Sequence, residues 1–200
     1  MTNTKKVLYM SLLSVLALNN SFADALTNEQ LSNLEISGVK IGMTEAEATS
    51  GLMQKYGVSK DQLKFRTNPF PHEITGEKKV LSYIEYNGEG ENAYIKFMLD
   101  VSQNPPINVV YQARYDMRYT KDNADNVEEA MKLKYGNPSI SGSNGNFFWC
   151  QLKDQYTCIK DINYLMFSRS QKIEILLEND GYSKAITDFK NKKKSKTANF

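Results

Sequence analysis

Apolar and polar residues alternate along residues 107–119, directly after Pro105 and Pro106. Alternation with a period of two places the two sets of side chains on opposite faces of a strand. The pattern predicts a long strand with one buried face and one wet face, which is typical of an antiparallel sheet. The predicted apolar face consists of Ile107, Val109, Tyr111, Ala113, Tyr115, Met117 and Tyr119.

Similar patterns predict further strands. Residues 93–99 alternate in the same way, with Ala93, Ile95, Phe97 and Leu99 on one face. The turn-forming cluster at residues 87–91, "NGEGE", predicts a hairpin before this strand. The other predicted strands span residues 79–86, 147–152, 157–160, 164–168 and 172–178.

Apolar residues spaced three or four apart predict helices. Thr44 and Glu47 form the spacing of a capping box, and Gly57 is expected to end the helix that follows. Further helices are predicted over residues 125–135 and 180–190. The expected apolar side of the helix at 125–135 contains Val127, Ala130, Met131 and Leu133.

Two segments of the chain are similar to each other. The first helix ends in "MQKYG" at residues 53–57, and the second ends in "KLKYG" at residues 132–136. The strand "IKFMLD" at residues 95–100 matches "IEILLE" at residues 173–178 in its apolar and polar positions. The order helix, turn, strands therefore recurs, which favours a duplication. We predict an α+β fold of two tandem modules, residues 24–119 and 120–190, each a helix on an antiparallel sheet.

The first residues have the pattern of a secretory signal. Lys5 and Lys6 precede an apolar run over residues 7–18, and small residues follow at Ser21 and Ala23. This pattern predicts a signal peptide over residues 1–23, with cleavage before Asp24. The run is too short to span a bilayer, which takes about 20 apolar residues. We therefore expect a periplasmic or secreted protein without a transmembrane segment.

The charge is unevenly distributed. Loss of Lys5 and Lys6 would leave 23 basic and 23 acidic residues, and five of the basic ones lie in "KNKKKSK" at residues 190–196. A body with a net charge of about −5 does not indicate nucleic-acid binding. Residues 191–200 are expected to form a disordered basic tail, which leaves open a weak contact with anionic lipid or an acidic partner.

Cys150 and Cys158 are the only cysteines, and His72 is the only histidine. In an exported chain two cysteines favour a disulfide, here across a hairpin in which Gln151 faces Thr157 and Leu152 faces Tyr156. A redox pair or a zinc site is the alternative. The chain has neither a C-x-x-C motif nor four zinc ligands.

Motifs for catalysis are scarce. The chain contains no G-x-S-x-G motif, no phosphate-binding glycine loop and no calcium-loop sequence. His72 lies between Pro71 and Glu73, where a surface loop is expected. The sequence therefore predicts a protein that is not an enzyme and needs no cofactor or metal.

The stretch "GVKIGMTEAEA" at residues 38–48 resembles the opening motif of the small outer-membrane assembly lipoproteins, the SmpA/OmlA group. Gly42, Met43, Thr44 and Glu47 carry the resemblance. The tandem layout is similar to the β-lactamase-inhibitor-protein fold. The chain lacks a lipid-bearing cysteine and continues beyond one module, so the resemblance implies a fold and a compartment but no partner.

Tyrosine is abundant, with 12 residues. Tyrosine-rich sheet faces suit protein binding, because the ring buries a large area and keeps a polar end. We predict a partner-binding face with Tyr94, Met98, Arg114 and Arg118. The predicted function is a non-catalytic, exported binding or envelope-associated protein whose partner is another envelope or secreted protein. A carrier of an apolar small molecule or lipid is the alternative.

Overall fold

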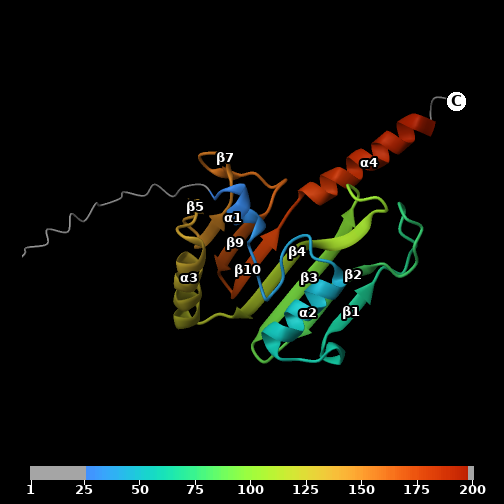
Figure 1. Ribbon diagram of the computed structural model, residues 1–200. Coiled ribbons are helices and arrows are strands. Elements are labelled where there is room, and N and C mark those ends of the chain that lie inside the picture. Colours follow the sequence, from blue (N-terminus) through green and yellow to red (C-terminus); the bar gives the residue numbers. More distant parts are fainter. Residues whose placement is uncertain (1–25, 198–200) are drawn as a thin grey trace, which may run out of the picture.

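One antiparallel sheet of eight strands runs through the molecule (Figure 1). The computed structural model describes residues 26–197, and it confirms the predicted α+β class. The strand order is β1-β2-β3-β4-β10-β9-β6-β5, and β7 and β8 form a separate small hairpin. The strands are β1 Lys64–Thr67, β2 Leu81–Asn87, β3 Glu91–Asp100, β4 Ile107–Arg118, β5 Ile140–Ser141, β6 Asn146–Trp149, β7 Leu152–Asp154, β8 Thr157–Cys158, β9 Tyr164–Arg169 and β10 Lys172–Glu178.

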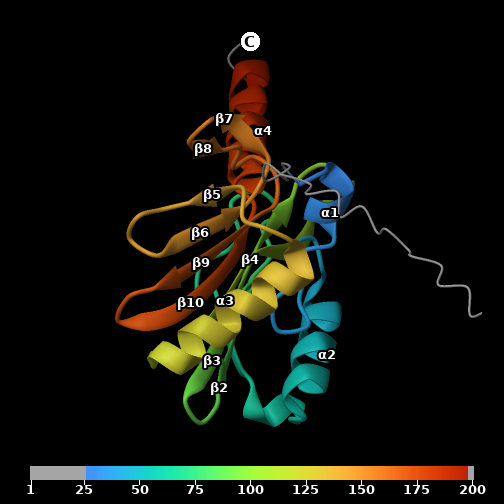
Figure 2. The ribbon, with the colours of Figure 1, turned by 90° about the vertical axis from the view of Figure 1, so that its left-hand side faces the viewer.

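Three helices cover one face of this sheet, while a fourth extends from one end (Figures 1 and 2). The covering helices are α1 Asn28–Ser32, α2 Glu45–Tyr56 and α3 Lys121–Tyr135, and a short 3₁₀ helix, η1, spans Lys60–Gln62. The extending helix is α4, Gly181–Thr197, which contacts the sheet at β3. No helix within residues 26–197 has the length and apolar character needed to cross a membrane.

The core is a row of apolar side chains between the sheet and the covering helices. Neighbours in register across six strands are all fully buried, because each points to the helix-covered face. The row consists of Ile84, Ile95, Ala113, Leu177, Leu165 and Trp149. The Trp149 indole donates a hydrogen bond to the carbonyl of Gly136 at the end of α3, which fixes that helix against β6.

The start of α2 confirms the predicted capping box. The backbone N–H of Thr44 donates to the Glu47 carboxylate at 2.8 Å, and the Glu47 N–H donates to the Thr44 hydroxyl. The loop before α2 packs directly on the helix. A Cβ on Gly38 would lie 2.6 Å from the carbonyl oxygen of Gly51, so both positions exclude a side chain.

The predicted alternation of β4 is only partly correct. A bulge breaks the register, since Lys96 pairs with Gln112 but Phe97 pairs with Val110. Tyr111 has no partner in β3. Residues 107–110 therefore point to the opposite faces from those that the alternation predicted. Beyond the strand, Tyr119 is 41% exposed, so its predicted place on the buried face is wrong.

Helix α3 begins four residues earlier than predicted, because the Thr120 hydroxyl accepts from the N–H of Asn123 and caps it. The prediction for its apolar side is correct for Met131 but wrong for Leu133, which is 82% exposed. The short strands β1 and β5 were not predicted, since neither has enough residues to show a period.

The predicted disulfide between Cys150 and Cys158 is confirmed, with 5.7 Å between the Cα atoms. The predicted hairpin pairing is wrong, because Leu152 pairs with Cys158 and Asp154 with Thr157. The disulfide packs against Tyr164 and Phe148 in a second, smaller apolar cluster.

The basic end of the chain differs from the predicted disordered tail. Helix α4 continues to Thr197, so residues 191–197 are helical. The predicted signal peptide over residues 1–23, with its cleavage point before Asp24, lies outside the described residues, as do residues 198–200.

Candidate binding site on the open face of the sheet

The face of the sheet opposite α1, α2 and α3 carries the side chains that alternate with the buried row, and it is termed the open face. Its residues align across the strands, because partners in register point to the same side. The middle row is Glu85, Tyr94, Arg114, Leu176 and Met166; one flanking row is Tyr83, Lys96, Gln112, Glu178 and Tyr164; the other is Asn87, Asn92, Asp116, Glu174 and Ser168.

An aromatic and cationic cluster lies on the β2–β4 part of the open face. The ring of Tyr94 packs on the ring of Tyr83, with 4.5 Å between centroids. The Arg114 guanidinium carbon lies 5.3 Å from the Tyr94 centroid, and the Lys96 ammonium lies 5.8 Å from it. Both cations are within the range of a cation–π interaction. Burial, followed by the neighbouring Tyr83, raises the pKa of Tyr94, so this ring keeps its hydroxyl proton at neutral pH.

A groove of about 400 Å³ lies beside this cluster. The open face forms its floor, and α4 and the loop between β1 and β2 contribute to its walls. Its lining includes Tyr83, Tyr94, Met98, Tyr111 and Ile186, together with Lys96 and His72. None of the described residues that line it carries a carboxylate, so the groove has a basic character.

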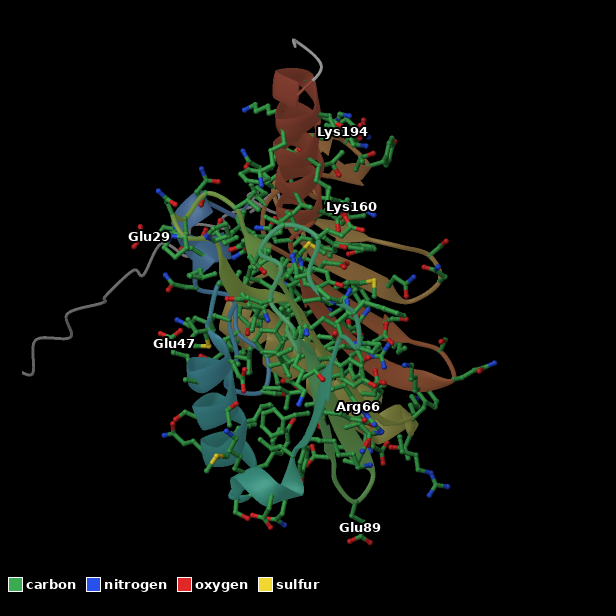
Figure 3. All side chains as sticks on the ribbon, turned by 90° about the vertical axis from the view of Figure 1, so that its right-hand side faces the viewer. Glu29, Glu47, Arg66, Glu89, Lys160 and Lys194 are labelled. Carbon is green, nitrogen blue, oxygen red and sulfur yellow. A yellow bond between two sulfur atoms is a disulfide. The ribbon has the colours of Figure 1, made fainter. Side chains whose placement is uncertain are left out.

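Helix α4 continues past this groove. Lys190 forms an ion pair with Glu73 of the β1–β2 loop, which ties the helix to that loop. Figure 3 shows Lys194, near the end of α4, at the opposite end of the molecule from Glu89 in the β2–β3 turn. The lysines of α4 therefore extend the basic character of the groove away from the body of the sheet.

The four predicted face residues do not form one cluster. Tyr94 and Arg114 are register partners, and Met98 lines the same groove as Tyr94. Arg118 lies four register pairs further along β4, opposite Lys172 at the exposed start of β10. Sequence reasoning missed Tyr83, because only the register of β2 against β3 places it beside Tyr94.

Ion pairs border the cluster on one side. Asp116 accepts from Lys172 at 3.0 Å and lies 3.3 Å from the Arg114 guanidinium nitrogen. Lys172 also pairs with Glu174 at 2.7 Å. The chain of alternating charges holds the Arg114 side chain in place over Tyr94.

The part of the open face on β9 and β10 is occupied by its own contacts. Glu178 accepts hydrogen bonds from the amide of Gln112 and from the hydroxyl of Tyr164. Burial and the adjacent Glu178 raise the pKa of Tyr164. The side chains of Glu178, Gln112 and Tyr164 therefore satisfy one another on this part of the open face.

His72 lies at the groove, but its surroundings are those of a turn. Its Nδ1 accepts from the N–H of Ile74 at 3.2 Å, and its backbone N–H donates to Glu77. Within residues 26–197, no group of three or more His, Cys, Asp or Glu side chains is arranged to hold a metal ion.

Comparisons with protein-family models, with curated proteins and with solved structures found no match to the chain. The resemblance of residues 38–48 to the outer-membrane assembly lipoproteins therefore remains a prediction.

Proposed function

We propose that this protein is a non-catalytic, exported binding protein that holds another envelope or secreted protein on the open face of its sheet. The observation that carries the proposal is the Tyr83–Tyr94–Arg114 cluster at the edge of a groove of about 400 Å³. Tyr and Arg are enriched among the residues that dominate binding energy at protein interfaces. Their rigid packing lowers the entropy cost of binding.

The partner segment is expected to be acidic. Lys96 lines the groove, and none of the described residues in its lining carries a carboxylate. Complementary charge steers association and fixes the orientation of a partner. An extended segment with one or two carboxylates and an apolar side chain for the surface of Met98 and Ile186 fits this chemistry.

The proposal includes the tandem architecture. Strands β1 to β4 occupy one half of the sheet and β5, β6, β9 and β10 the other, and the halves meet at their last strands, β4 and β10. Each half has one covering helix from its own part of the chain, α2 or α3. This arrangement supports two modules, and the Cys150–Cys158 disulfide supports an oxidising compartment such as the periplasm.

A pull-down from envelope extracts tests the proposal. Wild-type protein and the variants Tyr94→Ala and Lys96→Ala serve as bait. Tyr156→Ala is the matched control, because Tyr156 is 77% exposed and lies in the β7–β8 hairpin. The expected result is one partner that wild type and Tyr156→Ala retain and that Tyr94→Ala and Lys96→Ala lose. Retention of that partner by both groove variants, each folded by circular dichroism, would contradict the proposal.

A carrier function is the second candidate, and one observation favours it. A cleft of about 340 Å³ lies between α3 and the helix-covered face of the sheet. This volume is within the range of small-molecule sites. The cleft is open to solvent rather than enclosed, so it suits a ligand that is exposed on one side.

A further inference from the structure

Helices α2 and α3 lie apart on the sheet (Figure 1), and the cleft between them exposes the centre of the helix-covered face. Tyr115 of β4 and Ile175 of β10 are register partners and form its floor. Both are only partly buried, although they lie on the two central strands. An apolar residue that is partly exposed at the centre of a sheet can bind another apolar group, because the contact removes apolar surface of both groups from water.

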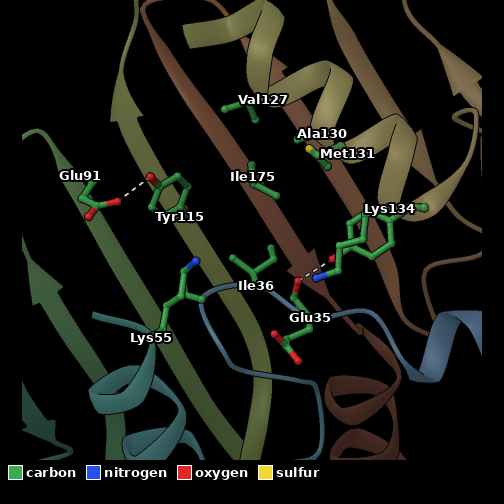
Figure 4. A pocket seen from close by; sticks show the side chains of 12 residues that line it. Glu35, Ile36, Lys55, Glu91, Tyr115, Val127, Ala130, Met131, Lys134 and Ile175 are labelled. Carbon is green, nitrogen blue, oxygen red and sulfur yellow. Dashed lines mark hydrogen bonds between the residues drawn. The ribbon is translucent and has the colours of Figure 1, made fainter. Parts of the chain in front are cut away.

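Most of the cleft is apolar. Val127, Ala130 and Met131 form the wall that α3 contributes, and Ile36 faces them from the loop before α2 (Figure 4). Met131 and Ile36 are themselves buried, at 5% and 6% exposure, and belong to the main core, so these walls are held in place by their packing. The apolar surface is therefore preformed.

Several polar groups at the cleft are already satisfied. The Tyr115 hydroxyl donates to the Glu91 carboxylate at 2.6 Å, and the Tyr135 hydroxyl donates to the carbonyl of Glu35 at 2.7 Å (Figure 4). Burial and Glu91 raise the pKa of Tyr115, so the hydroxyl remains a donor to that carboxylate. One carboxylate oxygen of Glu91 is thus occupied by a donor of the protein, and Glu91 also belongs to the cleft lining.

Two lysines border the cleft from opposite sides. Lys55 comes from the last turn of α2 and Lys134 from the last turn of α3. Neither forms an ion pair with another residue in the described part of the chain. In Figure 4 both ammonium groups lie on the cleft side, whereas the Glu35 carboxylate extends away from Ile175. The positive charges therefore face the cleft.

We propose that this cleft binds a small amphipathic carboxylate, such as a medium-chain fatty acid. The apolar chain lies on Ile175 between Ile36 and Met131, and the carboxylate lies at the rim beside Lys55 or Lys134. This inference names the ligand class for the carrier candidate and rests on it. It is independent of the proposed protein-binding groove, which lies on the other face of the sheet.

Isothermal titration calorimetry with decanoate, on the intact protein at neutral pH, tests the inference. We expect saturable binding of one decanoate per chain. Octanoate should bind more weakly, with about a fourfold loss for each methylene removed, because each methylene leaves apolar surface exposed to water. Decylammonium has the same chain with the opposite charge and is expected to bind at least threefold more weakly than decanoate, on the basis of the two lysines.

Variants locate the binding. Ala130→Trp places a large ring in the cleft from an exposed helix position, so it should abolish decanoate binding without unfolding the protein. Glu129→Trp is the matched control, since its side chain is on the same helix but does not line the cleft. Lys55→Gln and Lys134→Gln should each weaken binding about threefold, whereas Lys121→Gln at the start of α3 should not.

The inference is overturned by any of three results. These are a titration with decanoate that shows no saturable heat, equal or tighter binding of decylammonium, and unchanged decanoate binding in Ala130→Trp. None of them affects the pull-down, which depends on Tyr94 and Lys96 on the other face. Conversely, a failed pull-down leaves the titration as an independent result.

Discussion

The two halves of the sheet share one construction on the helix-covered face, where Ile95 of β3 and Leu165 of β9 belong to the same fully buried row. On the open face they differ. In the second half, Phe148 packs with Tyr164 under the disulfide-linked β7–β8 hairpin. In the first half, Tyr94 lies beside a groove and has cations over its ring.

This difference concerns what each half of the open face packs against. In the second half the disulfide and the β7–β8 hairpin pack against one end of the open face, where Tyr164 and Phe148 belong to a small second apolar cluster. In the first half, strands β2 to β4 carry polar and aromatic side chains on the open face, and these side chains do not form an apolar core. Substitutions on the two faces and in the two halves can therefore test the comparison, and the largest effects are expected where both halves are alike.

Ile95→Ala and Leu165→Ala should have the largest effects. Each removes a fully buried side chain from the common row, and each is expected to cost about 2–5 kcal/mol of unfolding free energy. Urea unfolding followed by circular dichroism measures the loss. A cost below about 1 kcal/mol for either variant would show that its half does not share the common core.

Removal of the disulfide should destabilise the protein by about 2–3 kcal/mol, because the closed loop is short. The double variant Cys150→Ala/Cys158→Ala, compared with wild type in urea without reductant, measures this difference. The effect belongs to the second half, so partner binding at Tyr94 should persist. An unchanged urea midpoint would mean that the hairpin packs against Tyr164 and Phe148 without the help of its crosslink.

Tyr164→Phe and Tyr94→Phe compare the same substitution in the two halves. Loss of the Tyr164 hydrogen bond to the Glu178 carboxylate should cost about 1.5 kcal/mol. Tyr94→Phe keeps the ring contacts and should stay within about 0.5 kcal/mol of wild type. Equal costs in urea unfolding would contradict the division between a stabilising half and a recognition half.

The last comparison concerns Tyr56→Phe, whose effect is seen through the pH dependence of stability. Tyr56 packs on Tyr86 and hydrogen-bonds Ser37, and burial raises the pKa of Tyr56 to about 12 from 10.0. Between these values the unfolded chain has lost this proton and the folded chain has kept it. Its contribution to stability is therefore present below about pH 10 and is lost as the pH rises through about 12.

Urea midpoints at about pH 9 and about pH 11 measure this loss. The decrease in the urea midpoint from about pH 9 to about pH 11 should be smaller in Tyr56→Phe than in wild type. Tyr119→Phe serves as the control, since Tyr119 is 41% exposed, and it should show the wild-type decrease. The same decrease in Tyr56→Phe as in wild type would exclude Tyr56 from the alkaline response.

Local patterns predicted the features that depend on neighbouring residues. The capping box of Thr44 and Glu47 is present, because its two hydrogen bonds join residues three apart. The alternation of β3 is correct, with Ile95 and Leu99 buried. The Cys150–Cys158 disulfide followed from a spacing that a hairpin closes.

The errors lie where distant segments meet. The bulge at Tyr111 depends on how β4 pairs with β3, and period-two alternation contains no sign of it. The exposure of Leu133 depends on which side of α3 meets the sheet. The apolar face predicted for that helix was too wide, because spacing alone does not place the boundary of a buried stripe.

The sequence by itself determined the longer strands and the positions of α2 and α3, because hydrophobic period and capping act over a few residues. It determined neither candidate site. Tyr83 and Tyr94 meet through strand register, and Ile175 lies open between α2 and α3 through the separation of two helices. Only the tertiary structure decided these contacts, since the register of β2 against β3 and the spacing of α2 and α3 depend on how separate segments pack together.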